Sequence, residues 1–130
     1  TIYISKDYLL DIYNKFYPNN LRIFVAKYND KFMSGIITLC FKNTISFWIG
    51  GAKTNIKGLY PNDLLHWEGI KWACEQGYKY YEEFGAGTER LARFKSKYNP
   101  MLVICFSVKK YSNLLIKLAE KIYHKIRIKL

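Results

Sequence analysis

Three strand-like runs separated by very short turns, and then a helix followed by a fourth strand, constrain this chain more than any other feature of its sequence. The three runs are rich in β-branched and aromatic side chains and cover residues 22–28, 32–41 and 44–49. The turns Asn29-Asp30-Lys31 and Lys42-Asn43 are long enough only to join antiparallel neighbours. We therefore predict an antiparallel meander.

The helix after the third run changes the strand pairing. Pro61 suits the first turn of a helix over residues 61–76, and Gly77 ends it. A strand over residues 78–84 follows, and a crossover helix between two strands of one sheet makes them parallel. We expect this helix to bury one broad apolar face, made of Leu64, Leu65, Trp67, Ile70, Ala73 and Cys74.

Helices are also expected at both ends of the chain. Ser5 can cap a helix over residues 6–17, with Leu9, Ile12 and Phe16 on one stripe. A short helix (90–98), an apolar strand (101–108) and a last helix (112–126) complete the predicted order αβββαβαβα. The last helix carries a stripe of Leu114, Leu115, Leu118, Ile122 and Ile126, opposite Lys117, Lys121 and Lys125. The fold class is α/β (α+β), one domain over residues 1–130 with a mixed, mostly antiparallel sheet.

The charge is concentrated near one end of the sequence. The chain has 130 residues and a net charge of +11, and residues 90–130 contain eleven Lys or Arg against one acid, Glu120. Such a region attracts phosphate on a cofactor, on RNA or on an anionic membrane. The three cysteines, Cys40, Cys74 and Cys105, lie in apolar runs without short ligand spacing. They predict reduced, buried thiols and a cytoplasmic protein, peripheral at most to the inner membrane face.

The sequence offers few residues for familiar catalytic or metal chemistry. His66 and His124 are the only histidines and have no acidic or thiol partner at metal-ligand spacing, so we predict no metal site. We interpret His66 as a helix-face residue that touches solvent or a backbone group. The chain contains no GxSxG, Walker or GxGxxG motif.

Two weaker signals concern carboxylates and phosphate. Glu82 and Glu83 are neighbours on a strand and point to opposite faces. Glu83 is either a partly desolvated base or orienting acceptor, or a solvated carboxylate paired with a cation. Lys57 and Gly58 precede the helix at residue 61, whose free N–H groups can bind phosphate unless Asp63 caps them.

Several segments resemble a known family. The run YPNDLLHWEGIKWA at residues 60–73, then Gly77-Tyr78-Lys79-Tyr80-Tyr81 and Glu83-Phe84-Gly85, resembles FemAB-like transferases (peptidoglycan-bridge or BioF-type) of the GNAT superfamily. In that branch a Leu-Leu-x-Trp helix leads to an aromatic strand and Asp-Phe-Gly. Phe94-Lys95 with Lys97-Tyr98 resembles the following Phe-Lys-x-x-Phe-Gly element, and residues 47–51 resemble the preceding aromatic strand. Glu83 replaces the usual Asp, Asn99 the usual Gly, and the GNAT pyrophosphate loop is absent.

The resemblance implies a site between two strands. The parallel pair would be splayed, with a thioester or aminoacyl ester in the gap, polarised by backbone N–H groups. Glu83 and Lys95 are the implied catalytic residues; Lys95 would stabilise developing negative charge or hold donor phosphate, and Phe94 would pack on the donor. The predicted donor-contact residues are Trp48, Gly50, Gly51, Lys57, Gly58, Phe84, Gly85 and Phe94.

The resemblance also implies an activity. The chain would be an N-acyltransferase that takes an acyl or aminoacyl group from acyl-CoA or aminoacyl-tRNA to an amine of a cell-envelope or sugar precursor, without a metal. An upstream second GNAT domain would complete it, so the chain would be the C-terminal part of a longer protein. The alternatives are a non-catalytic module that binds RNA through Arg90, Arg93, Lys95, Lys97 and the tail lysines, or a last helix that rests on an anionic membrane.

Overall fold

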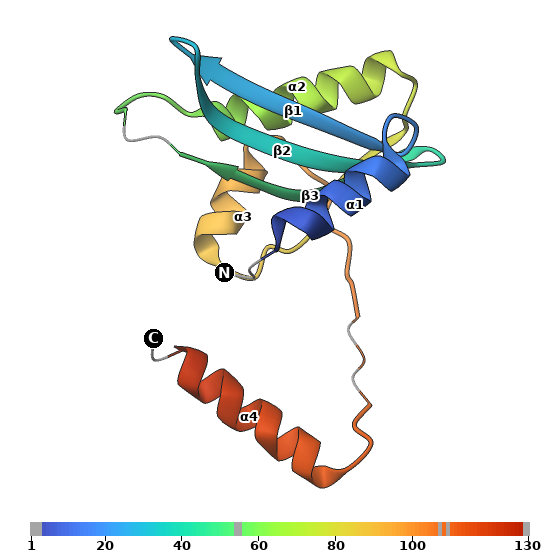
Figure 1. Cartoon of the computed structure of the whole chain (residues 1–130), viewed down its shortest axis with the longest axis vertical. Helices are drawn as coiled ribbons and strands as arrows, with labels where there is room; N and C mark the ends of the chain where they lie inside the picture. Colours follow the sequence, from blue (N-terminus) through green and yellow to red (C-terminus); the bar gives the residue numbers. More distant parts are fainter. Residues whose placement is uncertain (1–3, 54–55, 107, 109, 129–130) are drawn as a thin grey trace. The chain divides into compact units, whose positions relative to one another are not determined.

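The computed structural model describes residues 4–53, 56–106, 108 and 110–128. The chain divides into two compact units, residues 1–100 and residues 101–130. The first unit contains a four-stranded sheet in the order β1-β2-β3-β4, together with helices α1, α2 and α3 (Figure 1). The second unit contains helix α4.

The predicted meander and the parallel pair are both confirmed. Strands β1 (Leu21–Tyr28), β2 (Lys31–Phe41) and β3 (Thr44–Ala52) pair antiparallel, and β4 (Tyr80–Glu83) pairs parallel with β3. The turns rely on left-handed backbone conformations, with φ of 47° at Asn29, 59° at Asp30 and 52° at Lys42. Asn and Asp tolerate this conformation, so the two strands on either side can follow each other directly.

Helices α1 and α2 begin where the sequence predicts a start, and α3 begins one residue earlier. Helix α1 (Lys6–Phe16) is capped by Ser5, whose hydroxyl oxygen accepts from the Tyr8 N–H at 3.2 Å. Helix α2 (Pro61–Glu75) has proline in its first turn, and Gly77 follows it with φ of 79°. Helix α3 (Glu89–Ser96) is capped by Thr88, which accepts from the Leu91 N–H at 3.3 Å.

The core lies between the sheet and α2, which runs along the sheet in Figure 1. One cluster joins Ala26, Ile36 and Leu65, and a second joins Cys40, Ile45 and Ala73. In both clusters, two residues from one face of the sheet pack against one residue of α2. Burial of these side chains holds α2 against the strands.

The buried face of α2 differs from the predicted one. Its buried residues are Pro61, Leu65, His66, Gly69 and Ala73, whereas Leu64 and Trp67 are 53% and 51% exposed. The apolar residues of α2 nearly surround it, so hydrophobicity alone does not select a face. Close approach does: a Cβ at Gly69 would lie 3.3 Å from the Tyr81 hydroxyl oxygen, so glycine lets the helix come close to β4.

The predicted strand at residues 101–108 is wrong for the residues described. Residues 101–106 and 108 form no strand, and the side chains of Met101, Leu102, Ile104, Phe106 and Val108 are more than 80% exposed. A strand requires a partner for its backbone groups, and residue preference alone does not provide one. The observed order is therefore αβββαβαα.

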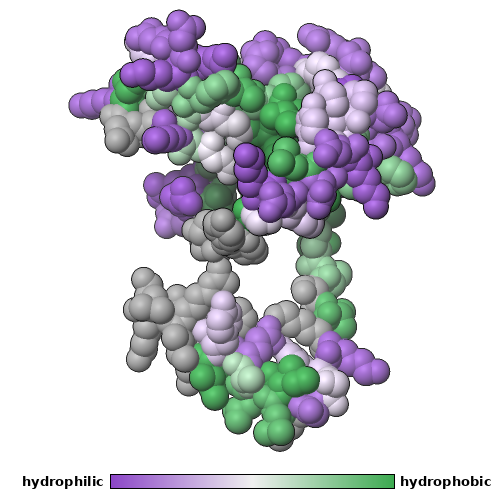
Figure 2. All heavy atoms as spheres, in the orientation of Figure 1, coloured by the Kyte–Doolittle hydropathy of each residue, from purple (hydrophilic) through white to green (hydrophobic). Residues whose placement is uncertain are grey.

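The last helix is confirmed, and it begins two residues later than predicted. Helix α4 spans Leu114–Ile128, and Asn113 caps it by accepting from the Ile116 N–H at 3.0 Å. Of the predicted stripe, Leu115, Leu118 and Ile122 are exposed. Figure 2 shows apolar side chains at the surface of this unit.

The thiols are free, but only one is buried. Cys40 lies in the core, while Cys74 and Cys105 are exposed, so the prediction of three buried thiols is wrong for two of them. Both of these residues lie in apolar sequence that the fold leaves at the surface. Within the described part of the chain, no helix is long and apolar enough to span a bilayer.

Candidate active site

Strands β3 and β4 part beside Glu83. They pair over four positions, from Thr44 with Tyr80 to Phe47 with Glu83, where β4 ends while β3 continues to Ala52. At this point the β2–β3 register shifts, which leaves Trp48 as an extra residue opposite β2. Such a bulge bends a strand away from its neighbour. The predicted splay is therefore confirmed, and we call the place where the strands part the fork.

Glu83 is the last residue of β4 and its carboxylate is buried at the fork. Its side chain is 12% exposed; Oε1 lies 2.5 Å from His66 Nδ1 and Oε2 lies 3.8 Å from Lys95 Nζ. Glu82 points the other way, into an exposed hydrogen bond from the Ser46 hydroxyl at 2.9 Å. Of the two interpretations of Glu83, the desolvated carboxylate matches the structure better than the solvated one.

His66 is a member of the site that sequence reasoning missed. It lies on the buried face of α2 with a side chain only 5% exposed, so the expected contact with solvent or a backbone group is wrong. Its ring is enclosed by Phe47 at 4.7 Å, Phe94 at 5.2 Å and Tyr98 at 6.1 Å between ring centroids. Pro61, Leu65, Gly69 and Ala73 mark the buried face, one residue every turn, but apolar residues all around α2 hide this face in the sequence.

Lys95 fixes the backbone that follows β4. Its ammonium group donates to the carbonyl oxygens of Phe84 at 2.5 Å and Gly85 at 2.6 Å, and its side chain is 13% exposed. Two of its three donors are thus occupied by backbone carbonyls. The structure places Lys95 next to Glu83, and the catalytic role of each residue stays a prediction.

Two tyrosines next to the cluster stay neutral. Burial raises the pKa of the Tyr81 hydroxyl above its usual range, and the charge of Glu83 raises it further. Burial, with Asp63 and Glu83 adding to it, raises the pKa of Tyr98 to about 12. In the described part of the chain, four buried polar atoms here have no aligned hydrogen bond: His66 Nδ1, Tyr81 Oη and both Glu83 carboxylate oxygens. Buried polar atoms without aligned bonds are costly, and such clusters are common at functional sites.

The predicted donor-contact residues of β3 differ in how much free space surrounds them. A Cβ at Gly50 would lie 2.8 Å from Ile36 Cγ2 and 2.9 Å from the Gly35 oxygen, so packing alone requires glycine there. A Cβ at Gly51 would meet no atom within 4 Å. Trp48 makes an edge contact with Tyr8 of α1, at 6.3 Å between ring centroids. Gly51 is the position whose glycine the chain's own packing does not explain.

Of the other predicted donor-contact residues, Phe84, Gly85 and Phe94 lie next to the fork. Phe84 is 66% exposed, and Gly85 adopts φ of 76°. Phe94 packs on His66 and Tyr98, which places it inside the aromatic enclosure. Beyond β3, Gly58 has φ of 85° and precedes α2 together with Lys57.

The first turn of α2 is not capped by Asp63. No side-chain hydrogen bond caps the helix, and Asp63 Oδ1 instead binds Lys97 Nζ at 2.5 Å. The Asp63 backbone carbonyl accepts from the Tyr98 hydroxyl at 3.2 Å. The alternative in which Asp63 occupies the helix donors is therefore wrong, and the phosphate site at Lys57 and Gly58 stays a prediction.

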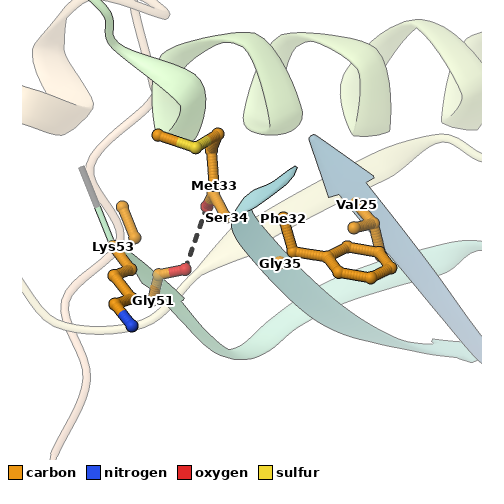
Figure 3. A pocket seen from close by; sticks show the side chains of 8 residues that line it. Val25, Phe32, Met33, Ser34, Gly35, Gly51 and Lys53 are labelled. Carbon is orange, nitrogen blue, oxygen red and sulfur yellow. Dashed lines mark hydrogen bonds between the residues drawn. The ribbon is translucent and has the colours of Figure 1, made fainter. Parts of the chain in front are cut away.

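A shallow depression of about 450 Å³ lies at the edge of the sheet where β1 ends, β2 begins and β3 ends (Figure 3). The Ser34 hydroxyl donates to the Gly51 carbonyl at 3.0 Å on its floor. The depression contains Gly51. It contains none of His66, Glu83 and Lys95, so it is separate from the group of side chains at the fork. Its lining residues are Val25, Phe32, Met33, Ser34, Gly35, Gly51, Ala52 and Lys53.

Comparison with known proteins decides the family. The sequence profile of the acetyltransferase (GNAT) domain matches residues 4–96. The chain belongs to the GNAT acetyltransferase family. No curated protein matches the sequence of this GNAT domain.

Solved structures agree with this assignment at the level of the fold. An aminoglycoside acetyltransferase from an uncultured soil metagenomic sample, in complex with sisomicin, aligns with TM-score 0.61 and 16% identity over 88% of this chain and 78% of that chain. AAC(6')-Iy in complex with a CoA-linked bisubstrate analogue of acetylneamine aligns with TM-score 0.63 and 9% identity over 82% of each chain. A candidate acetyl transferase from Pyrococcus furiosus aligns with TM-score 0.64 and 12% identity over 85% and 82%.

Proposed function

We propose that this GNAT domain transfers an acyl group from acyl-CoA to a primary amine. The observation that carries the proposal is the fork: β3 and β4 part directly beside the buried carboxylate of Glu83. Beyond Phe47, β3 has no β4 partner within the described residues, so its backbone groups are available to a donor. Backbone N–H groups fixed in this way stabilise the negative charge that develops on an acyl oxygen.

The donor would run along the unpaired part of β3. Trp48, Gly50 and Gly51 supply its edge, and the open space at Gly51 accommodates a chain lying against the strand. The phosphates would lie at Lys57, Gly58 and the start of α2, where no side chain caps the helix. Phe84 and Gly85 would form the opposite wall.

The transfer follows from these positions. The neutral amine attacks the acyl carbon, the C–N bond forms, the C–S bond breaks, and the sulfur leaves with the electron pair and takes up a proton. Before this attack the acceptor ammonium gives one proton to the Glu83 carboxylate as general base, and the proton that the sulfur takes up is the second one lost by the nitrogen. Both Glu83 oxygens are shielded from solvent, so the proton that Glu83 accepts travels through a water or after the Lys95 side chain moves. Lys95 has one donor left for the developing negative charge.

The substrates can be proposed more finely. We favour acyl-CoA over aminoacyl-tRNA as the donor, because AAC(6')-Iy, a structural neighbour, is solved with CoA and with a CoA-linked analogue. An amino sugar is the acceptor class that we favour, since several neighbours are aminoglycoside acetyltransferases. Placement in the FemAB-like branch, a cell-envelope precursor as acceptor and a second GNAT domain upstream rest on the sequence motifs alone.

The alternative of an RNA-binding surface loses support from the ion pairs. Arg93 pairs with Glu89 at 2.5 Å and Lys97 pairs with Asp63 at 2.5 Å, so two of its four named cations are locally neutralised. Lys95 is directed to backbone carbonyls. A buried carboxylate at the fork does not help to bind phosphate. Its presence therefore favours an acyltransferase over an RNA-binding module.

The test is product formation by the full chain with acetyl-CoA and longer acyl-CoA esters against aminoglycosides and simple amino sugars. Mass spectrometry of the N-acyl product is preferred to thiol detection, because Cys74 and Cys105 are exposed. Glu83→Gln should lower kcat/KM by about 100-fold with little change in CoA affinity. Glu82→Gln, the exposed neighbour, is the matched control. A chain that binds no CoA in calorimetry and forms no product is not this enzyme.

A further inference from the structure

Aromatic rings enclose the imidazole of His66 on several sides. Rings from β3, from α3 and from Tyr98 surround it, and its side chain is 5% exposed. An apolar side chain of similar volume would fill the same space without the cost of burying two ring nitrogens. The imidazole therefore needs an explanation beyond the core.

The distance between His66 and Glu83 supplies that explanation. Nδ1 and Oε1 lie 2.5 Å apart, and both atoms are buried. Two atoms that each present a lone pair repel at this distance unless a proton lies between them. The two atoms are not joined by an aligned hydrogen bond, so the short contact itself calls for a proton, and the carboxylate in this contact is the one at the fork.

We propose that His66 is a positioning residue for Glu83, and that the two side chains together hold the proton that the acceptor amine gives up. This rests on the proposed acyl transfer. One proton moves from the acceptor ammonium to the Glu83–His66 pair, and the nitrogen lone pair then forms the C–N bond. The C–S bond breaks, the sulfur takes the second proton lost by the nitrogen, and the pair returns its proton to solvent.

The titratable groups around the pair come from β4, from α3 and its end, and from α2. From β4 the neighbour is Tyr81, and from the end of α3 it is Tyr98; burial raises the pKa of both hydroxyls, so they stay neutral. Lys95 faces Oε2 from α3, and Asp63 lies on α2 itself, bound to Lys97.

Kinetic variants of His66 separate positioning from packing. Asn places its amide nitrogen close to where Nδ1 lies and can still donate to Glu83, but it has no titratable proton. We expect His66→Asn to keep CoA affinity, to lower kcat by about 10- to 100-fold, and to move the acidic limb of kcat/KM against pH by more than about one unit toward acid. His66→Gln should lose kcat similarly, and His124→Gln is the matched control.

Ring NMR gives a readout that does not depend on turnover. The chain has two histidines, so His124→Gln assigns both sets of imidazole signals. The His66 signals should change with pH at the midpoint of the kcat/KM profile in the wild-type chain. Glu83→Gln should move that midpoint, while Glu82→Gln should leave it in place.

The outcomes distinguish this inference from the function on which it rests. A wild-type chain that neither binds nor uses acyl-CoA overturns both. An active wild-type chain whose pH limb is unchanged in His66→Asn overturns the role of His66 alone. His66 signals that ignore Glu83→Gln overturn the shared proton, even if His66→Asn lowers activity.

Discussion

The ammonium group of Lys95 lies 2.5 Å from the carbonyl oxygen of Phe84, and through this bond α3 holds the backbone directly after β4. A second bond to the Gly85 carbonyl and the approach to Glu83 complete the contact. One cation thus serves two purposes: it satisfies carbonyls that have no strand partner, and it partly balances a buried carboxylate. The end of β4 is therefore fixed by a side chain where the sheet itself stops.

Removing this cation should destabilise the fold. We expect Lys95→Met to lower the free energy of unfolding by about 1.5–3 kcal/mol, because hydrogen bonds to a charged donor are lost and Glu83 stays buried. Lys97→Met, which removes a cation 54% exposed on the same helix end, should cost less than about 1 kcal/mol. Urea unfolding of both variants measures the difference, and equal losses would contradict this role of Lys95.

Adjacent glycines of β3 should respond differently to alanine. At Gly50 the new methyl group meets Ile36 and the Gly35 backbone, so we expect a loss of about 1–3 kcal/mol in stability. At Gly51 it meets open space, and stability should change by less than about 0.5 kcal/mol.

The substitution at Gly51 should affect donor binding. If acyl-CoA lies against β3, Gly51→Ala should weaken CoA binding several-fold in calorimetry while the chain stays folded. Unchanged affinity in Gly51→Ala would place the donor elsewhere.

The three thiols should react at two rates. Burial raises the pKa of the Cys40 thiol, which lowers its thiolate fraction and blocks access, whereas Cys74 and Cys105 are exposed. A disulfide reagent followed by absorbance should show two fast equivalents and a third only after unfolding. Cys40→Ala should remove the slow equivalent; three fast equivalents in the wild-type chain would show that Cys40 is accessible.

Stability should decline in alkali because of Tyr98. Its pKa is raised to about 12 in the folded chain, from about 10 when unfolded. The unfolded chain releases the proton first, so the stabilisation is complete below pH 10 and is lost as pH rises through 12. Tyr98→Phe should flatten this decline in urea unfolding between pH 9 and 12, and Tyr60→Phe, at a residue 69% exposed, should not.

Local signals were sufficient for most of the first unit. Short turns with residues that tolerate positive φ determined the meander, and Ser5, Pro61 and Gly77 marked helix ends. They failed at residues 101–108, because a strand depends on a partner that local preference does not supply.

For the candidate site, the sequence determined the carboxylate, the cation and their order along the chain: Glu83 at the end of a strand, Lys95 on the next helix. Tertiary structure alone decided that His66 joins them. The apolar residues of α2 nearly surround the helix, so its orientation is set by the close approach of Gly69 to Tyr81, a contact between segments twelve residues apart. That approach turns His66 toward Glu83, and no local pattern of hydrophobicity contains it.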